Sequence, residues 1–182
     1  MKTSSSTQVL DLIERLSRIS AAEHWIGDLN PAQLAALNYL AKANRYSRAP
    51  SQIAEFLSAM RGTVSGTLKA LARKGLIEEI KSKTDRRRTN YNITSQGLAA
   101  LKFETSIDSA LNSLNKSQIN QLEQNLKTLL KGILQARQDR SFGVCATCKH
   151  NRKDKHGSFC KLLEVKLTPH QITQVCFEHQ TA

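Results

Sequence analysis

The cysteines of this chain have a spacing that suits a metal site. Cys145, Cys148, Cys160 and Cys176 form the pattern C-x2-C-x11-C-x15-C, and the chain has 4 cysteines in all. Thiolates bind soft metals such as zinc and the iron of iron–sulfur clusters. Four thiolates complete the coordination of a tetrahedral zinc ion or of a [4Fe–4S] cluster. The sequence therefore predicts these residues as metal ligands, with unmetallated thiols or a disulfide switch as the alternative.

The same spacing favours a [4Fe–4S] cluster slightly over zinc. Structural zinc sites often combine two C-x-x-C pairs, and only the first pair is present here. Single cysteines supplied by separate segments suit a cubane cluster. His156 or His179 could replace one cysteine, but a surface or supporting role is the simpler interpretation.

Composition divides the chain near Ser141–Gly143. Residues 1–140 contain His24 and no cysteine, whereas the remaining histidines and every cysteine lie in residues 141–182. A tail of this size buries too little apolar surface to fold alone, so a bound metal would hold it together. We expect an N-terminal domain over 1–140 and a cysteine-rich, metal-binding tail over 141–182.

Hydrophobic periodicity and capping residues predict a mainly helical N-terminal domain. Asn30 followed by Pro31 is typical of a helix start, and Gly75 suits a left-handed helix end. Alternation of period two over Thr89–Ile93 predicts a strand that pairs with Ile77–Lys81. The expected helices cover about 5–20, 31–44, 51–57, 61–74, 94–115 and 117–138.

This order of helix, turn, helix and two-stranded ribbon predicts a winged helix-turn-helix over about 30–97. A helix fits the major groove of DNA, where each base pair presents a distinct pattern of donors and acceptors. The helix at 61–74 keeps small and polar residues on its solvent side, which lets its backbone approach DNA closely. The candidate DNA contacts on this helix are Arg61, Thr63, Ser65, Thr67 and Lys69.

A basic run occupies the predicted tip of the ribbon. There an arginine could reach a flanking minor groove, whose negative potential attracts basic side chains. Asp85 would orient a neighbouring arginine by a charge-assisted hydrogen bond. The formal net charge of +12 favours a polyanionic partner such as nucleic acid. The candidate contacts in the wing are Lys83, Asp85, Arg86, Arg87 and Arg88.

Over residues 5–138 the chain resembles the MarR family of winged-helix transcription regulators. The resemblance rests on Thr63-Val64-Ser65 in the recognition helix, Lys74-Gly75-Leu76-Ile77 at its exit, Asp85-Arg87 in the wing and Ile93-Thr94-Gly97 after it. It implies a homodimer, held together by helices at about 5–20 and 94–138, that binds pseudo-palindromic double-stranded DNA. The sequence offers no Ser/His/Asp arrangement, phosphate loop or paired carboxylates, so we do not expect an enzyme. We interpret such a regulator as a repressor.

The chain departs from the family pattern at two positions. Met60 stands where the family usually caps its recognition helix with Ser, Thr or Asp, which weakens the cap by about 1 kcal/mol. Gly66 stands where an arginine or another side chain is common. Reading of bases is therefore expected to depend more on Thr63, Ser65 and the wing.

Three functions remain open at this stage. The first is a regulator whose operator affinity is modulated by an iron–sulfur cluster, bound by the four cysteines, that senses redox state or iron. The second is a MarR-like regulator with structural zinc, in which a small organic effector binds near Trp25 and Tyr46. The third is a small metalloprotein or electron-transfer subunit. The N-terminus lacks the apolar core of a signal peptide, so we expect a cytoplasmic protein.

Overall fold

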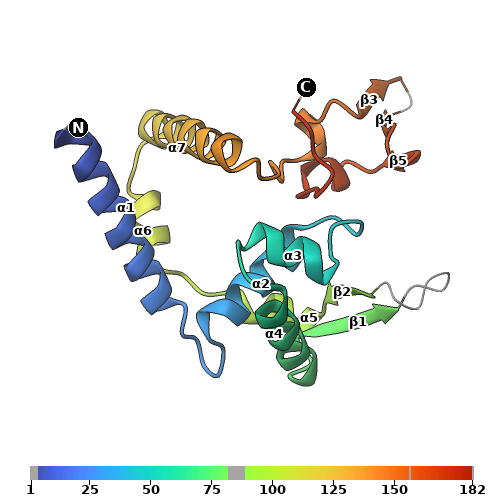
Figure 1. Cartoon of the computed structure of the whole chain (residues 1–182), viewed down its shortest axis with the longest axis horizontal. Helices are drawn as coiled ribbons and strands as arrows, with labels where there is room; N and C mark the ends of the chain where they lie inside the picture. The colour runs from blue at the N-terminus through green and yellow to red at the C-terminus, as the bar shows by residue number, and fades with distance from the viewer. Residues whose placement is uncertain (1–3, 82–88, 156, 182) are drawn as a thin grey trace.

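The computed structural model describes residues 4–81, 89–155 and 157–181. It consists of a winged-helix lobe, two long helices with exposed apolar faces, and a small tail (Figure 1). Within the described residues, no helix is long and apolar enough to cross a membrane. The elements of the lobe are α2 (Pro31–Lys42), α3 (Pro50–Phe56), α4 (Arg61–Arg73), β1 (Ile77–Lys81), β2 (Thr89–Ile93) and α5 (Ser95–Ala100).

Local capping and apolar periodicity account for the helices of the lobe. Asn30 and Gln33 form a reciprocal capping box at the start of α2, with Pro31 in the first turn. Leu37 on α2 and Leu68 on α4 are fully buried in one shared core, which fixes the angle between the two helices. The predicted start at Asn30-Pro31 is confirmed.

The wing follows directly from the end of α4. Gly75 has a φ of +71°, the left-handed conformation expected of it. Strands β1 and β2 pair antiparallel with Ile77 opposite Ile93, as the alternation predicts. Tyr91 is the buried residue of β2 and anchors the wing to the core of the lobe.

The helical region after the wing differs from the prediction of one helix over 94–115. The chain forms α5 and then α6 (Ser106–Asn112), separated by a non-helical stretch. Thr105 accepts a hydrogen bond from the backbone of Asp108, whose carboxylate accepts one from the backbone of Thr105. This second capping box starts a new helix, so the single-helix prediction was wrong.

Helices α1 (Ser4–Glu23) and α7 (Lys116–Arg137) flank the lobe and carry apolar stripes that this chain leaves uncovered. Leu12 and Leu16 on α1 are more than half exposed, and so are Leu126 and Leu130 on α7. No described residue of α7 is buried. Single chains rarely expose so much contiguous apolar surface, which indicates that these faces contact a partner.

The tail is a small β structure, whose strands the sequence patterns did not predict. Its strands form an antiparallel sheet in the order β3-β4-β5. The end of the chain closes the structure, because the amide of Lys149 donates to the carbonyl of Gln180. Its elements are η1 (Cys145–Thr147), β3 (Asn151–Asp154), β4 (Gly157–Cys160), β5 (Val165–Leu167) and η2 (Gln171–Thr173).

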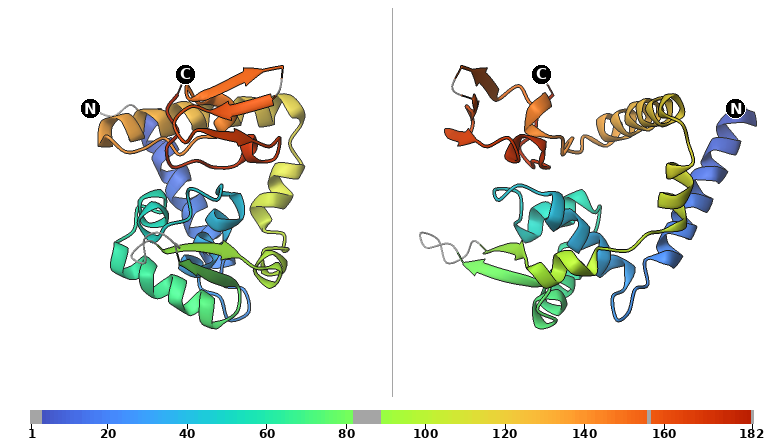
Figure 2. Two further views of the ribbon diagram at one scale, coloured as in Figure 1. Left: turned by 90° about the vertical axis from the view of Figure 1, so that its right-hand side faces the viewer. Right: turned by 180° about the vertical axis from the view of Figure 1, so that it is seen from behind.

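The tail lies against the lobe, beside α3 and the loop before it, in both views of Figure 2. Val175 of the tail forms a parallel bridge with Ala43 at the end of α2. Phe142 packs at ring-centroid distances of 5.2 Å from Phe56 and 5.6 Å from Phe177. The tail therefore packs on the winged-helix lobe, and does not simply extend from the end of α7.

Candidate DNA-binding surface and cysteine site

The recognition-helix candidates lie on the solvent-facing side of α4. Arg61, Thr63 and Lys69 are exposed, whereas Ser65 and Thr67 are partly buried. The hydroxyl of Thr67 donates to the carbonyl of Thr63 within the helix, so its donor is already used. Arg61, Thr63, Ser65 and Lys69 are thus more available to DNA than Thr67.

The start of α4 follows the expectation of a weak cap. Met60 precedes the helix with an extended backbone and forms no side-chain capping bond. Met60 thus supplies no acceptor to the first amides of the helix, and the positive end of the helix dipole there favours a phosphate. The wing candidates Lys83, Asp85, Arg86, Arg87 and Arg88 lie outside the described residues, so their predicted contacts stay predictions.

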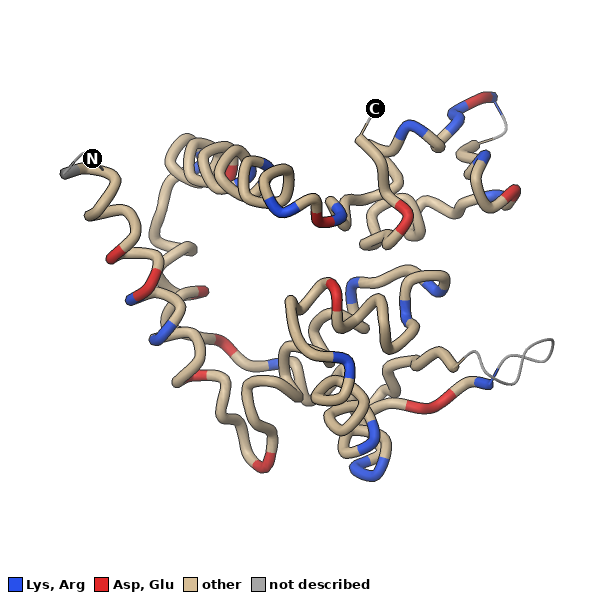
Figure 3. Tube along the Cα trace, in the orientation of Figure 1, with Lys and Arg blue, Asp and Glu red and all other residues tan. Residues whose placement is uncertain are grey.

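A groove joins the two candidate DNA-binding elements. Its walls include Arg61 and Ser65 of α4 and Thr89 and Asn90 at the start of β2. The turn before α3 contributes Arg45 and Tyr46, and α3 contributes its first residues. Lysines and arginines are spread along α4 and its surroundings (Figure 3). A groove of this composition suits a phosphate backbone, with polar groups for its oxygens and cations for its charge.

The tail also borders this groove, through Leu163 and Glu178. Glu178 is paired with Arg140, whose guanidinium also reaches Glu55 of α3 and stacks 4.1 Å from the ring centroid of Phe177. The arginine thereby links the tail to α3 and offsets the acid beside the groove.

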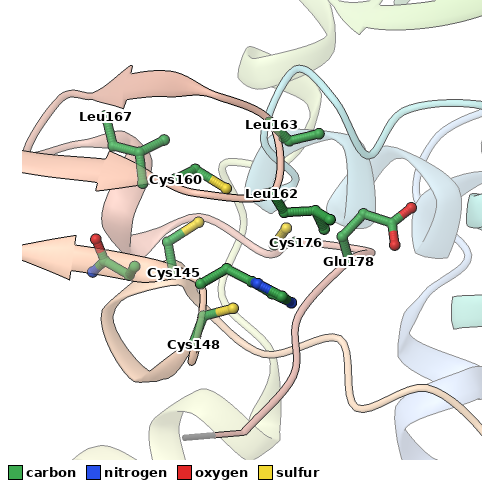
Figure 4. A pocket seen from close by; sticks show the side chains of 10 residues that line it. Cys145, Cys148, Cys160, Leu162, Leu163, Leu167, Cys176 and Glu178 are labelled. Carbon is green, nitrogen blue, oxygen red and sulfur yellow. The ribbon is translucent and has the colours of Figure 1, made fainter.

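The four cysteines come together in the tail. Cys145 begins η1, Cys148 directly follows it, Cys160 ends β4, and Cys176 follows η2; all are buried and free of disulfides. Figure 4 shows their side chains around one shared space. They line a cavity of about 270 Å³, mouth included, together with apolar side chains such as Leu162 and Leu167.

Hydrogen bonds set the charge distribution among these thiols. The pKa of Cys176 is lowered by a hydrogen bond from the Cys145 thiol, and further by those from Asn44, the backbone of Glu178 and Ser47, against the opposing effect of burial. The pKa of Cys145 is raised, chiefly because its thiol donates that bond and is buried. Of these two thiols, Cys176 is thus the one more readily held as a thiolate.

The described side chains around the cavity do not converge on a single metal centre. Among the described residues, no three His, Cys, Asp or Glu side chains form a group arranged to hold one metal ion. Asn151 also lines the cavity, and both polar atoms of its side chain are buried without a hydrogen-bond partner in the described structure. A buried amide left unpaired costs about 1–3 kcal/mol, so a ligand that satisfies it is expected there.

His179 supports the site from behind. Its Nδ1 lies 2.7 Å from the hydroxyl of Ser141, and its Nε2 lies 3.1 Å from the hydroxyl of Thr147. Burial lowers the pKa of this imidazole, which favours its neutral form. Because both ring nitrogens are occupied, the structure places His179 in a supporting position, whereas His150 lines the cavity itself.

A second cavity lies between α1, α2 and the region of α5 and α6. It is lined by His24, Tyr39, Phe56 and Phe103, among others, and by Val175 of the tail. Trp25 and Tyr46 are absent from its lining; Trp25 is 69% exposed, and Tyr46 faces the groove before α3. The walls of this cavity are therefore made by other residues than the two that the sequence suggested.

A mainly helical lobe with a two-stranded antiparallel wing defines the winged-helix fold of MarR-type regulators. The model of the MarR family matches residues 27–88, which span α2 to the wing. Regulators of that family are non-enzymatic DNA-binding proteins. A search of curated proteins found no match to the chain.

Solved structures share this fold. MepR of S. aureus in its DNA-binding conformation superposes with a TM-score of 0.57 at 24% identity, over 72% of this chain and 99% of that chain. The complex of S. aureus MepR with DNA gives 0.55 at the same identity and coverage. Streptococcus pneumoniae FabT in complex with DNA gives 0.52 at 18% identity, over 72% of this chain and 94% of that chain. About a quarter of this chain has no counterpart in them.

Proposed function

We propose that this chain is a dimeric, sequence-specific DNA-binding transcription regulator, acting as a repressor, whose operator affinity depends on a [4Fe–4S] cluster held by Cys145, Cys148, Cys160 and Cys176. The cluster would sense redox state or iron. The observation that carries DNA binding is the groove in which α4 and the base of the wing present Arg61, Ser65, Thr89 and Asn90 together. The DNA complexes of MepR and FabT, which share the fold, support the same partner.

The exposed apolar stripes of α1 and α7 support a homodimer. A dimer places two recognition helices on one side, so that each reads half of a pseudo-palindromic site. A second copy of the chain is the simplest partner for these faces, since an isologous contact buries the same stripe on both subunits.

Binding selection followed by fluorescence anisotropy tests DNA recognition. Random duplexes are enriched on the full-length protein, and the selected duplex is titrated at several salt concentrations. We expect tight binding that weakens steeply with salt, because phosphate contacts release counterions. Arg61→Ala should weaken binding, whereas Arg18→Ala, an exposed arginine on α1, should not. Absence of a selected sequence would leave the metalloprotein or electron-transfer alternative.

The donor set supports a cluster over a single zinc ion. In a zinc site the thiolates meet about 2.3 Å from one centre, whereas cluster ligands lie around a larger body. The four buried thiols surround an apolar cavity, and Asn151 adds an unpaired amide next to them. When bound, such a cluster supplies reversible one-electron chemistry. The residues of the chain hold it, exclude water from it and present an amide donor to it.

An optical spectrum with metal analysis distinguishes the candidates. Protein purified without oxygen should be brown and absorb near ~400 nm, and should lose that absorbance when Cys160 is changed to serine. Colourless protein with one zinc per chain would instead establish a structural zinc site.

A small organic effector is the second candidate for the regulatory signal. The cavity lined by Tyr39, Phe56 and Phe103 favours it, because aromatic walls suit a small apolar or phenolic molecule. Titration of operator-bound protein with a panel of small phenols tests this, with Phe103→Ala as the variant that should lose the response.

A further inference from the structure

The loop Ala43–Arg48 connects the cysteine site with the lobe through several hydrogen bonds. The amide of Asn44 donates to the carbonyl of Val175 at 2.9 Å, and the amide of Val175 donates to the carbonyl of Lys42 at 2.9 Å. The amide of Phe177 donates to the hydroxyl of Ser47 at 2.8 Å. These bonds hold the loop to both sides of Cys176 in the chain.

The loop also forms part of the surroundings of Cys176. The side chains of Asn44 and Ser47 both lower the pKa of its thiol, and the amide of the next residue, Phe177, donates to the hydroxyl of Ser47. Asn44 and Ser47 are almost completely buried, with exposures of 4% and 1%. Ser47 donates to Asn44 at 2.9 Å, and its carbonyl accepts from the hydroxyl of Tyr39 at 2.6 Å. A change at Cys176 therefore alters the surroundings of two buried loop residues.

The other end of the same loop is bonded to the wing. Arg48 donates to the side-chain oxygen of Asn92 on β2 at 2.8 Å, and twice to the carbonyl of Ala43. The carbonyl of Arg48 accepts from the amide of Tyr91, also on β2, at 3.2 Å. One short loop thus connects the surroundings of a predicted metal ligand with strand β2 of the wing.

The middle of the loop faces the groove. Arg45 is exposed there, and its guanidinium lies 4.8 Å from the ring centroid of Tyr46. Both line the groove together with Arg61 and Ser65 of the recognition helix. The loop is therefore positioned to place a cation near the phosphate backbone of a bound duplex.

We propose that the cysteine site acts on DNA through the loop Ala43–Arg48, within one subunit, and not through the spacing of the dimer helices. This inference rests on the proposed DNA binding and on the proposed cluster. When the four cysteines are engaged, Asn44 and Ser47 hold the loop, Arg45 stays in the groove and Arg48 steadies the wing. When they are not, the loop loses partners on its tail side. When the loop is already ordered, less conformational entropy is lost on binding DNA. Protein with engaged cysteines therefore binds DNA more tightly.

A route through α7, in which the tail changes the spacing of the dimer helices, would depend on the connection between α7 and the tail. The amide of Asp139 still bonds the carbonyl of Leu134 in α7, whereas Arg140 contacts α3 and the tail. Insertion of a Gly-Ser-Gly-Ser segment between Asp139 and Arg140 therefore separates α7 from the tail and leaves the contacts between tail and loop intact.

The experiment compares full-length protein reconstituted anaerobically with iron and sulfide against protein stripped with a chelator. Wild type should bind the selected duplex about fivefold or more tightly when reconstituted, which is the low end of usual coupling between sites. The insertion variant should keep that ratio. Asn92→Ala, which removes the acceptor of Arg48, should bring the ratio close to one. Glu78→Gln, which changes the other side-chain partner of Asn92, should keep it.

Hydrogen exchange of the same two forms without DNA gives an independent readout. Reconstitution should slow exchange at the amides of Asn44, Tyr91 and Phe177, and should leave the amides of α7 unchanged. The proposed route through the loop would be overturned if the insertion variant lost the affinity ratio between reconstituted and stripped protein, or if the protection changes were confined to α7. Wild type that binds the duplex equally in both forms would overturn the proposed cluster sensing and the loop route, but not DNA binding.

Discussion

Replacing Gly143 with alanine tests how the cysteine site is supported without changing a proposed ligand. A Cβ at this position would lie 2.5–2.6 Å from three atoms of the His179 ring. The ring has little room to move, because it is buried and both of its nitrogens lie within hydrogen-bond distance of the hydroxyls of Ser141 and Thr147.

The loss of stability expected from Gly143→Ala follows from those contacts. Overpacking a buried site costs about 1–3 kcal/mol, and each hydrogen bond lost as the ring is displaced costs about 1 kcal/mol. With partial relaxation we expect Gly143→Ala to destabilise the closed tail by about 2–4 kcal/mol. That corresponds to an increase of about 30- to 900-fold in the equilibrium constant for local opening.

Thiol reactivity measures this opening directly. Every cysteine of the chain lies in the tail and is buried, so reaction of metal-free protein with a thiol reagent under native conditions reports on the tail alone. The thiols of the Gly143→Ala variant should react about 30- to 900-fold faster than those of wild type. Gly132→Ala on α7 is the matched control, because its Cβ meets nothing within 4 Å. Equal rates for Gly143→Ala and wild type would refute the supporting role of His179.

Three further changes test other parts of the argument. Leu126→Glu places a charge on the exposed stripe of α7 and should convert the dimer to monomer in sedimentation velocity, whereas Lys127→Glu should not. Asn151→Leu removes an unpaired buried amide; it should stabilise metal-free protein by about 1–3 kcal/mol in urea unfolding, and lower the reduction potential of reconstituted protein because a hydrogen-bond donor is lost. Arg87→Ala should abolish tight operator binding in a gel-shift assay while gel filtration still gives a dimer; unchanged affinity would exclude Arg87 as a wing contact.

Local signals in the sequence were sufficient for the winged-helix lobe. The capping pair Asn30-Pro31, the left-handed Gly75 and the alternation over β2 each depend on residues a few positions apart. The same kind of signal was overlooked after the wing, where Thr105 and Asp108 start α6. The pattern T-x-x-D is a capping signature, so this break could have been predicted.

The docking of the tail could not be predicted in the same way. Asn44 ends the helix that the sequence predicts over 31–44, and Ser47 follows it in a polar segment, yet both are buried beside the tail. Their partners are about 130 positions away in the chain, and no periodicity marks such a pair. The spacing of the cysteines predicted convergence, but not the surface on which the converged site rests.

Thermodynamic linkage connects the two proposed sites in both directions. If engagement of the cysteines strengthens DNA binding by some factor, bound DNA must strengthen retention of the iron by the same factor. The loop Ala43–Arg48 can transmit this effect in both directions, because Arg48, which bonds the wing, and Ser47, which bonds the tail, are adjacent residues. Operator-bound protein should therefore hold its iron against a chelator more strongly than free protein does, and Asn92→Ala should remove the difference. Equal retention of iron with and without the duplex would show that the cysteine site and the DNA-binding site are not coupled.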